Sequence, residues 1–507
     1  MQNVQDSSKQ NTAELLPPSV ALKNAQVVSN SGVEPFSVFT AGQKRWISWV
    51  SSFGAMFSTL NSYIYFPAVI PIAQDLGVSV ALVNLTITSY LVVAGIAPAM
   101  MGDLADHEGR RPAYLAMCVL MVGANLGLAL QRSYPALFVL RMIQAAGSSG
   151  AFGAAHGVVS DIAPVAMRGS FTGAVVFFTN AAPGVGPIIS GALADSVGWP
   201  WIFWLLVILT TVYSVAVILF FPETQRRLVG NGSQRVDGLL YRNLFSTITT
   251  HRHAIDKSKP PVRVKQHRIP NPLACLPMLA YKNNLHVVLL GAITYSIRMT
   301  LQASLGSQCP ELYELTSLQA GLIFLPPGVA GAVAAKLQGL LIDHNYKRMS
   351  TDVIGSTDVR QRGEDISDFP IEKARLKGAA LLVIITVAGT VGYGVALMTR
   401  AHIAVMIIMQ FVTSYTTSSI FSITNTLQTD LNPTKAASIR GASNLVRCVL
   451  AGGCIAALEP VTQKIGLGWC FGVYAALQAS VLPMIWMLDS KGLEWRKNQA
   501  AKQGQRS

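Results

Sequence analysis

The residues of this sequence that could bind a charged group are cations and amides placed inside long apolar segments. The cations are Arg141, Arg298, Lys336 and Arg447, and the polar residues at similar depth include Asn61, Tyr65, Gln144, Asn180, Tyr295, Gln302, Gln410 and Asn444. An ionised side chain inside a bilayer is costly unless it faces a polar interior or a partner. No Asp or Glu falls near the middle of an apolar segment, so the pattern mildly favours an anionic ligand.

Arg141 allows two interpretations. It shares one face of an expected helix, residues 136–160, with Gln144 and Gly147, which predicts that it points into a polar interior. It also lies near the start of that helix, so its side chain could instead snorkel to the headgroups.

The same residues argue against an enzyme. The sequence has no HExxH motif, no His/Cys cluster with metal-ligand spacing and no carboxylate pair within an apolar segment. The six cysteines form no CxxC pair and lie mostly in apolar segments, where they act as small hydrophobic residues. We therefore expect no catalytic residues, no cofactor and no metal.

A dense charged stretch, residues 102–112, separates two apolar segments. Asp106 precedes Arg110 by four positions, so one helical turn could bring the two side chains into contact. Taken alone, the stretch could equally be an ordinary loop on the positively charged side of a membrane. Its spacing recurs later, because Gly102, Asp106, Arg110 and Arg111 are matched at one offset by Gly339, Asp343, Lys347 and Arg348. Such internal repetition is typical of secondary transporters, whose substrate path lies between the two halves.

The composition is that of a protein that crosses a membrane many times. Of 507 residues, 51% are hydrophobic and only 13% are charged. With about 20 apolar residues for each crossing, the chain accommodates about twelve helices. We expect a disordered tail over residues 1–44, six-helix bundles over 45–221 and 284–488, a basic linker over 222–283 and a second tail over 489–507.

The net charge is +14, and the basic residues are concentrated on one side of the expected membrane protein. All but seven of the 39 Lys and Arg residues fall on one side, and the exceptions are Arg132, Arg141, Arg298, Lys336, Arg400, Arg447 and Lys464. Because Lys and Arg resist translocation, that side is expected to be cytoplasmic and to hold both termini. Such a surface suits anionic lipid headgroups rather than nucleic acid.

Several of these motifs resemble the major facilitator superfamily. Residues 102–112 are similar to its signature loop between helices 2 and 3, and residues 339–348 resemble the weaker copy between helices 8 and 9, with Tyr346 in place of a glycine. Arg141 and Gln144 resemble its helix 4 motif. The resemblance implies two pseudo-symmetric halves and an inner-gate charge cluster made of Asp106, Arg110, Arg111 and Asp161, with Asp343, Lys347 and Arg348 as a second copy.

The segment over about 171–195 resembles the helix 5 motif of the antiporter branch. Gly173, Gly186, Pro187 and Gly191 match that motif, whereas Ala182 and Ser190 replace two of its glycines. A general small-residue packing face is the alternative interpretation.

Pro222-Glu223-Thr224 and Asp368-Phe369-Pro370-Ile371-Glu372 resemble fungal twelve-helix drug:proton antiporters of the quinidine-resistance and citrate-exporter subgroup. The resemblance implies alternating-access efflux of a drug or metabolite, coupled to protons, by a monomer in a fungal plasma membrane. His156 is the one titratable candidate for coupling in the first six helices, and it lies toward the inner face. A citrate-like organic acid exporter and a non-transporting sensor are the alternatives.

Overall fold

The computed structural model describes residues 36–164, 167–234, 236, 238–241, 275–354, 369–432 and 435–504. In this part of the chain every regular element is a helix. The predicted tail over residues 1–35 and most of the predicted linker lie outside the described residues. Residues 36–44, the last part of the predicted tail, are structured, and the first helix begins at Ala41.

The first bundle contains six long helices with a short break after the first. Its elements are α2 (Ala41–Tyr63), η2 (Phe66–Ala68), α3 (Val69–Leu76), α4 (Val80–His107), α5 (Arg110–Leu130), α6 (Tyr134–Ile162), α7 (Arg168–Ser196) and α8 (Pro200–Phe220). Thr40 starts α2 with a capping box, since its hydroxyl accepts from the Gln43 amide while the Gln43 side chain accepts from the Thr40 amide.

The second bundle repeats this plan after a short packed segment. That segment holds α9 (Arg226–Val229) and η4 (Leu239–Tyr241), and the second bundle consists of η7 (Leu276–Ala280), α10 (Lys282–Leu312), α11 (Ser317–Leu322), α12 (Leu325–Ile354), α13 (Ile371–Leu376), α14 (Ala379–Met398), α15 (Ile403–Leu431), α16 (Ala436–Ile465), α17 (Leu467–Ala479) and α18 (Val481–Gly504).

Ten helical stretches of the described residues are long and apolar enough to cross a membrane. The long helices α2 and α6 are outside that set and complete the twelve expected crossings. Both carry polar side chains that are buried within the protein, including Ser52 and Asn61 on α2 and Arg141 and Gln144 on α6. Their lower hydropathy therefore reflects these buried polar side chains.

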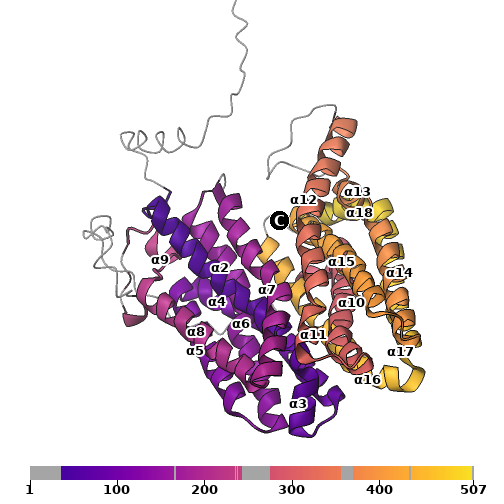
Figure 1. The fold of residues 1–507 in the computed structure, drawn as a ribbon. Coiled ribbons are helices and arrows are strands. Elements are labelled where there is room, and N and C mark those ends of the chain that lie inside the picture. Colours follow the sequence, from indigo (N-terminus) through magenta and orange to yellow (C-terminus); the bar gives the residue numbers. More distant parts are fainter. Residues whose placement is uncertain are drawn as a thin grey trace, which may run out of the picture.

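The two bundles lie side by side, the first in indigo to magenta and the second in orange to yellow (Figure 1). We call the end that holds the start of α2, α9 and α13 the tail end, and the end that holds α3 and α11 the far end (Figure 1). Contacts between the bundles run along α4 and α16 and along α7 with α11 and α12.

Glycines allow the two bundles to meet closely near the far end. A Cβ atom at Gly328 of α12 would lie 2.7 Å from the Cα atom of Gly184 on α7. A Cβ at Gly191 would collide with the carbonyl oxygen of Ser317, and one at Gly321 with that of Pro187. Phe66 also stacks on Phe324 across the halves, with ring centroids 5.8 Å apart. The far end is therefore closed by direct backbone packing.

The four glycine and proline positions predicted on α7 do not share one environment. Gly191 and Pro187 face the second bundle, whereas a Cβ at Gly186 would meet the Leu60 side chain of the first bundle at 3.0 Å. A Cβ at Gly173 would meet no neighbouring element within 4 Å. The close crossing is therefore made by only part of this motif.

Replacing Gly191 with Val is expected to lower the free energy of unfolding by about 1–3 kcal/mol, because a side chain there would push backbone atoms of the two bundles apart. The measurement is the thermal unfolding of the purified protein in detergent. Gly173→Val on the same helix is the matched control and should leave the transition almost unchanged. Equal transitions for both variants would contradict the packing argument.

Candidate functional site

The predicted contact between Asp106 and Arg110 is present at the tail end of the first bundle. Arg110 Nη1 lies 2.7 Å from Asp106 Oδ1, and Arg110 Nε lies 3.0 Å from Asp161 Oδ2. The three side chains differ in exposure: Asp106 is 57% exposed, whereas Arg110 and Asp161 are 9% and 8% exposed. We call Asp106, Arg110 and Asp161 the first triad. The stronger of its two ion pairs is Arg110–Asp161, because solvent screens the exposed carboxylate of Asp106.

Arg111 does not belong to the first triad, contrary to its place in the predicted cluster. Its guanidinium donates to the carbonyl groups of Val217, Ile218 and Phe221 at the end of α8, and to that of Leu240. Successive residues of a helix point about 100° apart, so Arg110 and Arg111 cannot both face α6. Arg111 instead satisfies the free carbonyls of a neighbouring helix end.

Glu223 is the buried anchor of this region, and the sequence did not identify it as a site residue. Its carboxylate accepts hydrogen bonds from the backbone amides of Arg110, Arg111, Thr224 and Gln225, at 2.8–3.0 Å. Two of these amides open α5, where a helix terminus favours negative charge. Burial raises the pKa of Glu223, and the four backbone donors oppose that shift.

The chain after Glu223 covers the first triad. Gln225 donates to the carbonyl of Asp106 at 2.8 Å, and Arg226 Nε donates to the carbonyl of Asp161 at 3.0 Å. The Arg226 guanidinium also contacts the start of the described chain, because its central carbon lies 3.6 Å from the centroid of the Phe36 ring. This part of the predicted linker is therefore packed on the first bundle.

The second bundle holds an equivalent triad made of Asp343, Arg375 and Asp430. Arg375 Nε lies 2.9 Å from Asp430 Oδ2, and its Nη1 lies 4.0 Å from Asp343 Oδ1. Asp343 is 76% exposed, and its ion-pair partner among the described residues is Arg375, which the repeat did not indicate. Arg348 is exposed on α12, which continues to Ile354, so it cannot open the following helix as Arg110 does. The side chain of Lys347 lies outside the described part.

Arg141 points into the first bundle, as predicted, and does not snorkel, since it is fully buried. Its guanidinium carbon lies 4.1 Å and 4.4 Å from the ring centroids of Tyr65 and Tyr90. Nη1 donates to the Asn61 carbonyl at 3.1 Å and to Gln144 Oε1 at 2.5 Å. Arg141 is thus held by aromatic faces and neutral acceptors, which stabilise a cation without neutralising it.

A second cationic site lies in the other bundle, where Arg298 and Arg447 flank an aromatic pair. The Arg447 guanidinium carbon lies 4.9 Å from the Tyr295 centroid and 5.2 Å from that of Phe421. Arg298 Nη1 donates to Ser418 Oγ at 2.8 Å. Arg298 follows Tyr295 by three residues on α10, which places the two side chains on neighbouring positions of one helix face. We call Tyr295, Arg298, Ser418, Phe421, Asn444 and Arg447 the two-arginine site.

The remaining predicted substrate residues are less closely connected to these arginines. Gln302 is buried one helical turn from Arg298, with an unpartnered Oε1. Lys336 and Asn180 are exposed on α12 and α7. His156 packs edge-on against Phe152 with centroids 4.9 Å apart. The sequence missed Tyr90 and Phe421, although an aromatic residue beside polar ones in a span is the expected neighbour of a buried cation.

Across the described ranges, no Asp or Glu forms an ion pair with Arg141, Arg298 or Arg447. The described residues also contain no group of three or more His, Cys, Asp or Glu that could hold a metal ion. The two arginine environments are therefore positively charged, a property suited to binding an anion.

The fold resembles solved transporter structures. The human organic anion transporter MFSD10 aligns with 88% of this chain and 100% of its own, with a TM-score of 0.54 and 15% identity. A D-xylose–proton symporter covers 87% of this chain and 96% of its own, with a TM-score of 0.60 and 14% identity. At these identities the likeness establishes the fold, and it confirms the predicted architecture.

Sequence comparisons extend this likeness to fungal proteins. "MFS-type transporter phiD" of a fungal species is 35% identical over 92% of this chain and 71% of its own length. "MFS-type transporter tstD" of Talaromyces stipitatus is 32% identical over 95% and 88% of the two chains. "Citrate exporter 1" of Aspergillus niger is 30% identical over 91% and 88%.

The model of the Major Facilitator Superfamily matches residues 51–457. The homologues are transporters and not enzymes, as the sequence predicted. With its helical membrane fold and its fungal relatives, this chain is a multi-pass membrane transporter that belongs to the major facilitator superfamily.

Proposed function

We propose that this transporter exports small organic anions by alternating access, in exchange for protons. The observation that carries the proposal is the pair of cationic environments described above, which have no acidic partner in the described structure. A buried or half-buried guanidinium without a counter-ion lowers the free energy of a bound carboxylate, and arginine binds carboxylates through two parallel hydrogen bonds.

Alternating access requires that one end closes while the other opens. The backbone packing of α7 with α11 and α12 closes the far end, and the two triads lie at the tail end, within each bundle. Partly buried ion pairs can exchange partners during a small rigid-body rotation, so we assign to the triads the role of inner gates.

The tail end is cytoplasmic in this proposal, because it carries the basic side of the sequence and both ends of the described chain. We place a monomer in the fungal plasma membrane with anionic lipids at its basic face. Proton antiport is supported by the resemblance of α7 to the antiporter branch. Comparing efflux from proteoliposomes with and without an imposed pH gradient tests the coupling.

A citrate-like organic acid is the second, narrower candidate for the substrate. The specific observation in its favour is the relative named "Citrate exporter 1", which aligns with 91% of this chain. Counterflow of labelled citrate in proteoliposomes tests this candidate and also separates transport from a sensor without flux.

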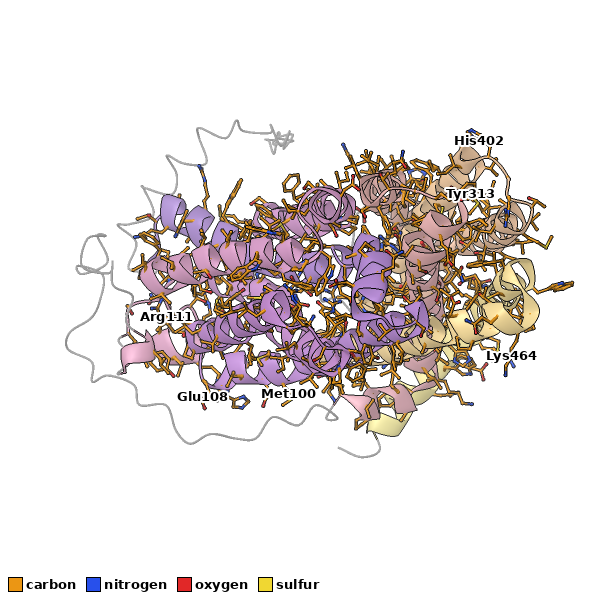
Figure 2. The ribbon with its side chains drawn as sticks, turned by 60° about the horizontal axis from the view of Figure 1, so that its bottom comes forward. Met100, Glu108, Arg111, Tyr313, His402 and Lys464 are labelled. Atoms are coloured by element: carbon orange, nitrogen blue, oxygen red, sulfur yellow. The ribbon has the colours of Figure 1, made fainter. Side chains whose placement is uncertain are left out.

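Substitution of either arginine of the two-arginine site by Ala is expected to weaken citrate binding at least tenfold. Loss of a hydrogen bond to a charged group costs about 1.5–3 kcal/mol, and about 1.4 kcal/mol corresponds to a factor of ten in Kd. The measurement is citrate binding to the purified protein by calorimetry. Lys464→Ala is the matched control, since Lys464 is an exposed cation of the same bundle (Figure 2). Unchanged affinity in both Arg298→Ala and Arg447→Ala would contradict an anion site here.

A further inference from the structure

We propose that Asn444 is a positioning residue that transmits anion binding at Arg447 to the contact between the two bundles. An anion that takes the Nε–Nη2 edge of Arg447 displaces the Asn444 amide and thereby loosens α16 from α4. This inference rests on the anion site proposed above.

Asn444 connects the two bundles through both ends of one amide. Its Oδ1 accepts from Arg447 Nε at 3.1 Å and from Nη2 at 2.6 Å. Its Nδ2 donates to the carbonyl of Ala94 at 2.9 Å and to that of Gly95 at 3.3 Å, both on α4. The orientation of the amide follows from its partners, because a guanidinium only donates and a carbonyl only accepts.

The contact that Asn444 holds is tight. A Cβ atom at Gly95 would lie 3.0 Å from the Cβ of Cys448, one helical turn beyond Asn444. Thr88 on α4 donates to the carbonyl of Gly452 at 2.9 Å, and a Cβ at Gly452 would lie 3.2 Å from the Thr88 side chain. Because α4 and α16 pack closely along this stretch, the hydrogen bonds of Asn444 to Ala94 and Gly95 are part of the contact that holds the two helices together.

Competition for Arg447 supplies the coupling. Nε and Nη2 form the edge that binds a carboxylate bidentately, and both now donate to one neutral amide oxygen. A carboxylate is the stronger acceptor, so a bound anion replaces Asn444 there. Arg447 and Asn444 are only half-buried, so the edge can be approached. The displaced amide turns toward another donor, and its hydrogen bonds to Ala94 and Gly95 weaken.

The coupling is reciprocal. If anion binding weakens the contact between α4 and α16, then separating these helices must strengthen anion binding by the same factor. A transporter built in this way changes conformation more readily when it is loaded.

Two variants of Asn444 test the competition, with citrate as the probe. Asn444→Ala removes the competitor from Arg447, so citrate should bind more tightly than in the parent. Asn444→Asp has the same size but places a permanent carboxylate on Arg447, so citrate should bind at least tenfold more weakly. An equal loss of affinity in both variants would show that Asn444 is merely structural and would overturn the inference.

A thiol reporter tests the transmission. Native Cys448 is buried against Gly95 at this contact, so the rate at which a maleimide modifies Cys448, followed by peptide mass spectrometry, rises when α4 and α16 separate. Citrate should speed this modification at least threefold when Asn444 is present and leave it unchanged after Asn444→Ala. An equal effect of citrate with and without Asn444 would overturn the inference while leaving the anion site intact. A parent protein that does not bind citrate would overturn the citrate-binding site and this inference together.

Discussion

Replacing Arg110 with Gln is expected to abolish transport and to destabilise the first bundle. Arg110 is the cation shared by two carboxylates, and one of them, Asp161, is only 8% exposed. Removing one partner of a buried ion pair leaves an uncompensated charge, which costs about 3–5 kcal/mol. The measurements are counterflow in proteoliposomes and thermal unfolding in detergent.

The matched controls are the Asn variants of the two carboxylates, and their effects should differ because the two side chains differ in exposure. Asp161→Asn should lower transport and stability more than Asp106→Asn, because a pair with an exposed carboxylate contributes about 1 kcal/mol or less. Arg375→Gln in the second bundle should lower transport and stability as Arg110→Gln does. Asp430 is 19% exposed and pairs with Arg375 Nε, as Asp161 pairs with Arg110 Nε. Wild-type transport by Arg110→Gln would rule out a gating role for the first triad.

Replacing Glu223 with Leu is expected to cause the largest loss of stability among these substitutions. The carboxylate satisfies four backbone amides at once, and Leu satisfies none of them. A buried donor without an acceptor costs about 1–3 kcal/mol, so even partial relaxation leaves a loss of several kcal/mol. We expect little folded protein in the membrane and a strongly lowered unfolding temperature for the remainder.

Glu494→Leu is the control for this experiment, because Glu494 is an exposed carboxylate on α18. Its unfolding temperature should match the parent. Restoration of most of the loss by Glu223→Asp would indicate that a carboxylate, and not the length of the side chain, is what the start of α5 requires. A normal unfolding temperature for Glu223→Leu would mean that other acceptors reach these four amides.

The sequence predicted the parts of the site that depend on residues close together in the chain. Asp106 and Arg110 are four residues apart, at the end of α4 and the start of α5. The face that Arg141 shares with Gln144 and Gly147 favoured the interior over snorkelling. Both follow from neighbouring residues alone. The fold followed from composition and from the repeated signature loop.

The remaining site residues depend on distant parts of the chain. Glu223 meets the start of α5 from 113 residues away, and Arg375 meets Asp430 from 55 residues away. The spacing of the repeat pointed to Arg348, but α12 extends past this residue and the equivalent helix start lies beyond residue 369. A pattern of spacings cannot show where a helix ends when the following loop has a different length.

The unneutralised arginines also determine how the transport cycle responds to voltage. Their charges belong to the protein and stay with it, so the net charge moved in one cycle is that of the exported anion together with that of the protons that enter in exchange. At a potential that is negative inside, each exported negative charge releases about 2.3 kcal/mol per 100 mV. Efflux of such a cargo is therefore electrogenic, and depolarising the membrane should slow it.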